Sequence, residues 1–444
     1  MSRKNTRILL YLFVILSTAV FLFWLYLFTG DINGSQRAVF YGDGHDWFMD
    51  WFNVVYYSVG KRPYTWGLIE ERSLPPLTFF LLYPFSKLYQ YDITGWVENE
   101  SRYEARYSQL PIDMFTLVFI LSYLLLFYAM YKHSRRAAAT GLSDITRAAL
   151  FGVLFISGVN LFCIDRGNLQ VVTAAAVFLY IYLCDTETMS YAGRRVTHDD
   201  EGQIRSQQAS PVRTGTGVFC LAFAAAIKLF PAIMGILLLY RKKWKEAVGA
   251  FVTGMAMFLL PFLWIDQPFL EAIGSFIKTV GEHARSYLTI AEFGFSTPML
   301  TGFTGLSHGV LQVIAYILAV LALVTAWGLK SYWKRIMLVT LVLVMTSGQQ
   351  GYYCLMFLFL PIVLFFNEEH DIKDVLYVLC FVVILSPLQR TVFVNDIRIT
   401  MRDIINIVLI GLYAELLIEA VCSAWHLLRH GGSLPVTEGS REGK

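Results

Sequence analysis

Charge is scarce in this 444-residue sequence: 16% of the residues are charged, 56% are hydrophobic and 16% are aromatic. Soluble domains carry about a quarter charged residues, so the composition excludes an ordinary soluble fold. The formal net charge is only +3, and no basic run alternates with aromatic residues, which excludes a nucleic-acid partner. The composition predicts an all-α polytopic membrane protein.

Metal-binding and cofactor-binding motifs are also missing. The six cysteines stand singly in apolar runs, without a Cys-x-x-Cys pair or a histidine at ligand spacing, so we expect them to be packing residues. The histidines and carboxylates form no ligand cage, so we expect no metal. The sequence has no glycine-rich phosphate loop and no soluble sheet domain, which argues against a nucleotide-sugar donor. We therefore expect no cofactor.

What the sequence does contain is a series of long apolar runs. A basic N-terminus precedes the run Ile8 to Phe28, which is about 20 residues long and lacks a small-residue cleavage site, so it is predicted to be an uncleaved span. Lys and Arg beside short loops mark the cytoplasmic side. The predicted cytoplasmic segments are 132–147, 185–213, 241–245, 330–335, 367–373 and the C-terminal tail. This frame predicts about twelve transmembrane helices, with both termini in the cytoplasm.

The domain organisation follows from the same predicted membrane topology. Residues 1–430 are predicted to form one transmembrane domain, with a long cytoplasmic loop at 185–213 and a flexible cytoplasmic tail at 431–444. Residues 30–111 are predicted to form the first outer loop, which contains an interfacial helix. Within it, the apolar run Leu77 to Leu88 is too short and too close to proline to cross the membrane, so we expect a re-entrant segment.

Two hairpins are too short for two full spans. The run Gly217 to Tyr240 has to leave and return within 24 residues, whereas two spans need about 40. Short helices that meet below the surface solve this problem. Lys228 lies at the tip of this hairpin, and Arg166 and Asn168 lie at the tip of the preceding one. A lysine in an apolar run is costly unless it faces a wet cavity or an anion. We therefore expect both tips to face one outer cavity.

Three carboxylates, Asp43, Asp46 and Asp50, lie within eight positions just after the first span. On one helix, Asp46 and Asp50 would share a face, and their pairing would raise the pKa of one of them, which suits a general base. The alternative is that one of the three caps the helix. The neighbouring Trp47, Phe48, Trp51 and Phe52 are predicted to anchor the helix at the membrane interface, with stacking on a sugar as the alternative.

The order of these features resembles a known enzyme group. The matching motifs are the aspartate and aromatic segment 46–57, Gly-x-x-x-Tyr at 60–64, Pro-Pro-Leu at 75–77, Arg-Gly-Asn at 166–168, Lys-Leu-Phe-Pro at 228–231 and Gln-Gln-Gly-Tyr-Tyr at 349–353. This order is similar to that of the GT-C superfamily of membrane glycosyltransferases. It most resembles glycosyltransferase family 87, whose members include mannosyltransferases that use polyprenyl-phosphate-mannose.

The resemblance implies a GT-C fold and a glycosyltransferase. Such an enzyme transfers a sugar, here expected to be mannose, from a polyprenyl-phosphate donor to a lipid or glycan acceptor with inversion. The active site is expected on the outer face of a bacterial plasma membrane, in contact with membrane lipids. The first loop lacks an Asp-x-Asp motif, so a metal-independent mechanism is expected.

The resemblance also implies roles for individual residues. The base is expected among Asp46, Asp50 and Asp43, of which Asp46 has the best spacing from the Gly-x-x-x-Tyr turn. Cations have to hold the leaving phosphate, and Arg166, Lys228 and Asn168 are the candidates. Each of these residues can instead have a structural role: an ion pair for Arg166, snorkelling to the interface for Lys228 and helix capping for Asn168. Further candidate substrate-binding residues are Tyr64, His283, Arg285, Gln350 and Tyr352.

Two other functions stay open. A transporter or flippase of lipid-linked sugars would also have about twelve spans, but its charged residues should lie near the membrane midplane. A polymerase or ligase of lipid-linked glycans would rely on a late outer loop that contains Arg and His. Residues 265–307 include His283 and Arg285, which is compatible with that reading.

Overall fold

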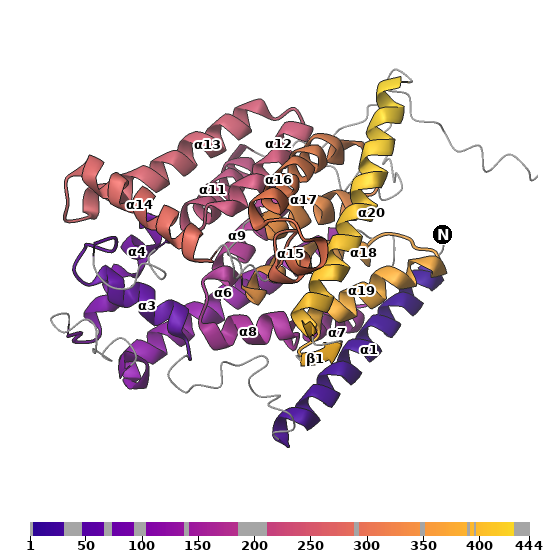
Figure 1. Cartoon of the computed structure of the whole chain (residues 1–444), viewed down its shortest axis with the longest axis horizontal. Coiled ribbons are helices and arrows are strands. Elements are labelled where there is room, and N and C mark those ends of the chain that lie inside the picture. Colours follow the sequence, from indigo (N-terminus) through magenta and orange to yellow (C-terminus); the bar gives the residue numbers. More distant parts are fainter. Residues whose placement is uncertain are drawn as a thin grey trace, which may run out of the picture.

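A computed structural model describes residues 3–30, 47–65, 73–92, 104–136, 142–184, 211–287, 293–346, 351–388, 391–394 and 397–429. These residues are almost entirely helical (Figure 1). The one sheet among them is a two-stranded hairpin, in which β1 (Thr391–Val394) pairs antiparallel with β2 (Ile397–Thr400). The predicted all-α fold does not include this hairpin.

Among the described residues, five helices are long and apolar enough to cross a membrane. They are α1 (Arg3–Thr29), α6 (Gln109–Arg136), α13 (Trp244–Leu259, continued by η7, Leu260–Trp264), α16 (His308–Thr325, continued by η8, Ala326–Gly328) and α20 (Met401–Arg429). A sixth span is obtained if α7 (Asp144–Phe155) and α8 (Gly158–Arg166), bent by 55°, count as one. The long helices expose apolar side chains, such as Leu124 on α6 and Val320 on α16. Lipid is the solvent that suits such faces.

These findings confirm a membrane protein that is built mainly of helices. The first predicted span, Ile8 to Phe28, lies within α1, and the next long apolar run, Ile112 to Tyr131, lies within α6. The total of about twelve spans and the orientation of the termini stay predictions, because five or six helices meet the criteria of length and composition.

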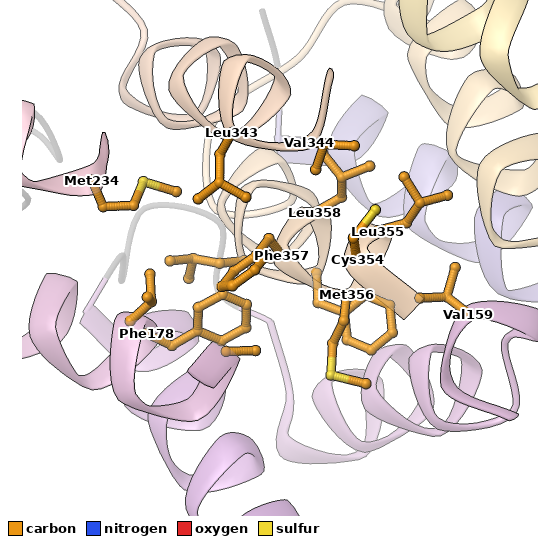
Figure 2. Close-up of a cluster of buried hydrophobic side chains, with 14 of the residues drawn as sticks. Val159, Phe178, Met234, Leu343, Val344, Cys354, Leu355, Met356, Phe357 and Leu358 are labelled. Carbon is orange, nitrogen blue, oxygen red and sulfur yellow. The ribbon is translucent and has the colours of Figure 1, made fainter. Parts of the chain in front are cut away.

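Shorter helices form the interior. They are α9 (Gln170–Cys184), α11 (Pro211–Ile227), η6 (Phe230–Gly235), α12 (Ile236–Tyr240), α17 (Tyr332–Thr346), η9 (Tyr352–Leu358), α18 (Phe359–Phe365) and α19 (Val375–Leu385). A helix that is apolar all round belongs in a core, and α17 and α18 are buried on nearly every side. Figure 2 shows η9 at the centre, where Phe357 lies near Phe178 of α9, Met234 of η6 and Leu343 of α17.

The remaining elements connect these helices. In the predicted first outer loop they are α3 (Met49–Ser58), α4 (Pro76–Leu82), η3 (Tyr83–Lys87) and η4 (Ala105–Tyr107), and later α14 (Phe269–Tyr287), α15 (Pro298–Thr304) and η10 (Ile372–Asp374). The predicted re-entrant segment thus consists of a seven-residue helix and a 3₁₀ turn. The predicted hairpin 217–240 is also broken, because α11 ends at Ile227 and η6 follows with Pro231.

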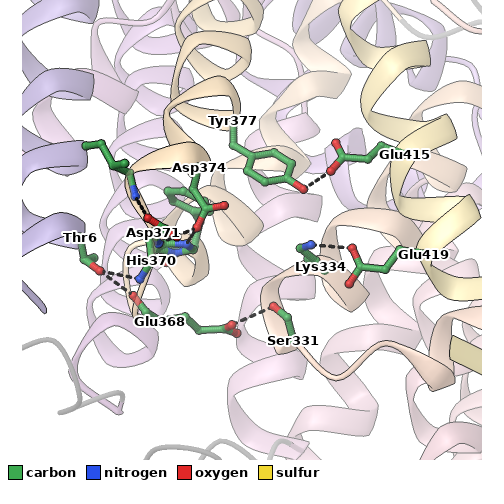
Figure 3. Close-up of polar contacts among 12 residues, drawn as sticks. Thr6, Ser331, Lys334, Glu368, His370, Asp371, Asp374, Tyr377, Glu415 and Glu419 are labelled. Atoms are coloured by element: carbon green, nitrogen blue, oxygen red, sulfur yellow. Dashed lines mark hydrogen bonds and ion pairs between the residues drawn. The ribbon is translucent and has the colours of Figure 1, made fainter. Parts of the chain in front are cut away.

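Polar contacts tie α1, the start of α17 and α20 to one another and to Glu368, which follows α18 (Figure 3). The Glu368 carboxylate accepts a hydrogen bond from the Ser331 hydroxyl at 2.8 Å and also caps the first N–H groups of α17. The Thr6 hydroxyl on α1 donates to the Glu368 carbonyl, and Lys334 pairs with Glu419 of α20 at 2.5 Å.

All six cysteines lie within the described residues and form no disulfide.

The start of α8 packs closely against the backbone of Pro387. A Cβ atom at Gly158 would lie 2.6 Å from the Cα atom of Pro387, whereas one at Gly152 of α7 would meet nothing within 4 Å. We expect Gly158→Ala to lower the free energy of unfolding by about 1–3 kcal/mol, because the Pro387 backbone has to shift. Gly152→Ala should leave it unchanged or raise it by up to about 1 kcal/mol through helix propensity. Thermal unfolding in detergent measures both, and equal midpoints would refute the close contact.

Candidate active site

The helix that carries Asp50 begins later than the sequence predicts. The α3 helix starts at Met49, and Phe48 before it has the left-handed conformation, with φ of 57°. The sequence predicted one helix that carries both Asp46 and Asp50, whereas the described helix starts after Asp46 in the sequence; the pairing of the two carboxylates stays a prediction. Asp43 and Asp46 lie outside the described residues. The physical reason is the left-handed turn, which is uncommon for a non-glycine residue and which no local rule assigns to phenylalanine.

The aromatic residues of α3 also differ from the prediction. Trp51 and Phe52 are 1% and 2% exposed, so the expectation that they anchor the helix at the membrane interface is wrong. Both rings pack against Phe115 of α6, at centroid distances of 5.5 and 6.0 Å. Packing among aromatic rings inside the protein thus holds α3 in place.

The start of α3 lies directly against the end of α8. The Phe48 N–H donates to the Asp165 carbonyl at 2.7 Å. Gly167 ends α8 with φ of 61°, and a Cβ atom there would lie 3.0 Å from the Cα atom of Phe48. Glycine is suited to both requirements, since it tolerates positive φ and close backbone approach. This contact brings Asp50 next to Arg166 and Asn168.

Asp50 is held by two partners from the loop after α8. Arg166 donates to Asp50 Oδ1 from Nη2 at 2.7 Å and from Nε at 3.2 Å, and Asn168 Nδ2 donates to Oδ2 at 2.5 Å. The side chains of Arg166 and Asp50 are 14% and 22% exposed. Charge-assisted hydrogen bonds of this kind are stronger than neutral ones. The ion-pair alternative for Arg166 is therefore the arrangement that the structure adopts.

Asn168 connects this ion pair to Lys228. Its Oδ1 atom accepts a hydrogen bond from Lys228 Nζ at 2.7 Å and from the Gln170 backbone N–H at 2.9 Å, at the start of α9. Lys228 Nζ also donates to Gln170 Oε1 at 3.1 Å. The capping role of Asn168 and its contact with the charged residues thus occur together. We name Asp50, Arg166, Asn168, Gln170 and Lys228 the polar cluster.

Lys228 follows the last residue of α11 and is only 8% exposed. Its ammonium group lies 5.0 Å from the centre of the Tyr353 ring. Snorkelling to water is thus not what this side chain does, because its charge is satisfied inside the protein by amide oxygens and an aromatic face. Asp50, Arg166 and Lys228 together carry one net positive charge, which favours an anionic ligand.

Two predicted binding residues are buried, and their hydroxyl groups donate to backbone carbonyls. The Tyr64 hydroxyl donates to the Leu74 carbonyl at 2.9 Å, and the Tyr352 hydroxyl donates to the Ser386 carbonyl at 2.7 Å. Their exposed fractions are 4% and 0%. Both tyrosines therefore serve packing and backbone hydrogen bonding in this structure.

The other predicted residues are not part of the described cluster. His283 lies on α14, and burial lowers its pKa to about 4, so its imidazole is neutral at pH 7 and supplies no positive charge. Gln350 and the Arg285 side chain lie outside the described residues. Within the described residues, no group of three or more His, Cys, Asp or Glu side chains could hold a metal ion.

The sequence did not single out Gln170, which belongs to the cluster, or Tyr353 and Arg402, which lie near it. Gln170 contacts Lys228 directly, and a glutamine in an otherwise apolar run was the signal that could have revealed it. The Tyr353 ring, rather than that of Tyr352, faces Lys228 and stacks on Phe162 of α8 at 5.8 Å. The Arg402 guanidinium of α20 lies 5.6 Å from the same Phe162 ring.

The family model of glycosyltransferase family 87 matches residues 75–361, more than half of the chain. The chain belongs to glycosyltransferase family 87. It is thus a GT-C type membrane glycosyltransferase, as the sequence motifs implied. The matched range contains Arg166, Asn168 and Lys228, whereas Asp50 precedes it. No curated protein and no solved structure matches the chain.

The contact between Asp50 and Arg166 can be tested by a double-mutant cycle with Asp50→Asn and Arg166→Gln. We expect a coupling free energy of about 1–3 kcal/mol, because the two side chains are mostly buried and share hydrogen bonds. The matched control is the exposed pair Arg62 and Asp266, with side chains 56% and 63% exposed, whose coupling should be below about 1 kcal/mol. Thermal unfolding of the four variants in each cycle gives both values. Equal couplings would contradict the buried ion pair.

Proposed function

We propose that this family 87 enzyme transfers mannose from a polyprenyl-phosphate donor to a lipid or glycan acceptor, with inversion at the sugar carbon. The observation that carries the proposal is the polar cluster, which joins one carboxylate to two cations. Its members come from segments far apart in the sequence: Asp50 and Arg166 are 116 positions apart, and Asn168 and Lys228 are 60 positions apart. Charges gathered in this way inside an apolar protein favour a functional site.

The transfer needs one base and stabilisation of one leaving anion. The acceptor oxygen forms a bond to the sugar carbon as the bond from that carbon to the phosphate oxygen breaks. The acceptor proton passes to a carboxylate, and the donor leaves as a polyprenyl monophosphate, whose added negative charge is stabilised by fixed cations. The proposed base is Asp46 or Asp50 of the first outer loop, with Asp43 as the third candidate.

Different observations favour Asp50 and Asp46 as the general base. Asp50 is adjacent to both cations, but its two carboxylate oxygens already accept hydrogen bonds from Arg166 and Asn168. Asp46 has the better spacing from the Gly-x-x-x-Tyr turn. Either residue can thus be the base, and in the case of Asp46 the role of Asp50 is to hold Arg166 in position.

Arg166 and Lys228 supply the positive charge that the leaving phosphate requires. An arginine presents a planar fork that matches phosphate oxygens, and a lysine presents a point charge. Two such cations support a mechanism without a divalent ion. The proposed active face is the outer side of the plasma membrane, because the basic segments of the sequence predict that the opposite ends of the helices are cytoplasmic.

The base is identified by sugar transfer in proteoliposomes, with radiolabelled polyprenyl-phosphate-mannose and a bacterial lipid extract as acceptor. We expect either Asp46→Asn or Asp50→Asn to lower kcat by about 10²–10⁴-fold, the contribution of a general base. The control is Asp266→Asn, which alters an exposed ion pair and should leave transfer unchanged.

Other outcomes refute separate parts of the proposal. Wild-type rates in both aspartate variants would exclude Asp46 and Asp50 as the base. Transfer from polyprenyl-phosphate-arabinose but not from the mannose donor would refute the sugar assignment. Movement of lipid-linked sugar between leaflets without any transfer would favour the transporter function instead.

A further inference from the structure

Gln170 contains a polar group that the described contacts leave without a partner. The side chain is 0% exposed, and its Oε1 atom accepts a hydrogen bond from Lys228 Nζ at 3.1 Å. Its Nε2 atom is buried and has no hydrogen-bond partner among the described residues. Buried side-chain donors almost always have an acceptor, so this amide requires an explanation.

The orientation of the Gln170 amide is fixed by chemistry. The two ends of a glutamine amide look alike, and a flip would exchange them. Here a flip would turn the NH2 group toward the Lys228 ammonium, which has only donors. The oxygen therefore has to face Lys228, and the NH2 group occupies the other branch of the same amide. Gln170 is thus a donor that lacks an acceptor among the described residues.

The Lys228 ammonium group has one N–H donor more than the acceptors it contacts among the described residues. An ammonium group has three N–H donors, and Lys228 uses two of them, for Asn168 Oδ1 and Gln170 Oε1. Both acceptors are neutral amide oxygens, so its charge is hydrogen-bonded but not neutralised by a direct contact with a carboxylate. Gln170 is also the first residue of α9, whose N-terminal end adds a partial positive charge. Three features at one place therefore favour an anion.

The two cations of the polar cluster differ in this respect. Arg166 already donates from two of its nitrogens to the Asp50 carboxylate. Lys228 has no such carboxylate in direct contact among the described residues. A phosphate can therefore bind at Lys228 without breaking an ion pair, whereas binding at Arg166 competes with Asp50.

We propose that Gln170 is a binding residue for the phosphate group of the donor, together with Lys228. The Gln170 Nε2 group donates to one phosphate oxygen, and the remaining N–H of Lys228 donates to another. The identity of the phosphate as part of a lipid rests on the proposed function. The Tyr353 ring, 5.0 Å from Lys228 Nζ, has to turn aside when the phosphate enters.

The test measures, by isothermal titration calorimetry, how tightly the full-length protein in detergent binds a polyprenyl monophosphate. Polyprenol of the same length and inorganic phosphate are the comparison ligands. We expect the wild type to bind the monophosphate at least about tenfold more tightly than polyprenol. Gln170→Glu should lose at least tenfold in affinity, because its carboxylate neutralises Lys228 and repels the phosphate. Gln170→Met, which removes the donor without adding charge, should also bind more weakly.

The matched control is Gln109→Met. Gln109 lies at the exposed start of α6, where its amide donates to Asp113, and this variant should bind like the wild type. Thermal midpoints without ligand show whether each variant is folded. If Gln170→Glu does not fold, Gln170→Met decides. Binding of inorganic phosphate as tightly as of the lipid, with the same dependence on Gln170, would support the subsite and assign it to free phosphate.

Two results would overturn the inference. One is equal affinity of the wild type for monophosphate and polyprenol, and the other is wild-type affinity in a folded Gln170 variant. Binding requires no sugar transfer, so the outcome is separate from that of the proposed function. If the monophosphate binds through Gln170 and no sugar donor supports transfer, the subsite stands and the proposed reaction fails. If transfer occurs, Gln170→Glu should raise KM for the donor more than it lowers kcat.

Discussion

A charged side chain inside an apolar membrane protein has to be solvated by the protein itself, and this constraint shapes the centre of the molecule. Lys228 and Arg166 are both largely buried, and water contributes little to their stabilisation. Amide groups and one carboxylate take the place of water. Asn168 is the key side chain, because it accepts from Lys228 with its oxygen and donates to Asp50 with its nitrogen. Its loss would disconnect the two cations at once.

The helices around the cluster make this solvation possible. Long helices with apolar outer faces meet the lipid, and the shorter helices inside end before they could cross. Chain ends and turns therefore occur within the protein, where α8 ends at Arg166 and α11 ends one residue before Lys228. Irregular backbone at such depth is tolerated only when it is buried in protein or lines a cavity. The broken helices and the polar cluster thus depend on each other.

Sequence reasoning succeeded where a single residue carries a large energetic cost. Arg166, Asn168 and Lys228 stand out because polar groups interrupt apolar runs, and the structure brings them together with Asp50. The first two spans were likewise predictable from length and hydropathy.

The features that were missed depend on tertiary structure or on an unusual local conformation. The left-handed Phe48 shifts the start of α3, and contacts with α6 bury Trp51. A 3₁₀ turn rather than an α-helix begins at Tyr352, and the neighbouring Tyr353 is the residue that faces Lys228. Neither propensity nor periodicity gives these outcomes, because each depends on which segments meet in space.

The α20 helix has a mechanical consequence for the whole molecule. Near its start, Arg402 lies over the Phe162 ring, which stacks on Tyr353 beside Lys228. Farther along, Glu419 pairs with Lys334 at the start of α17. A 29-residue helix is about 43 Å long and behaves as a stiff rod over this distance. The two contacts are therefore kept at a fixed spacing, so that one rigid helix sets the distance between the aromatic stack beside the cluster and the start of α17.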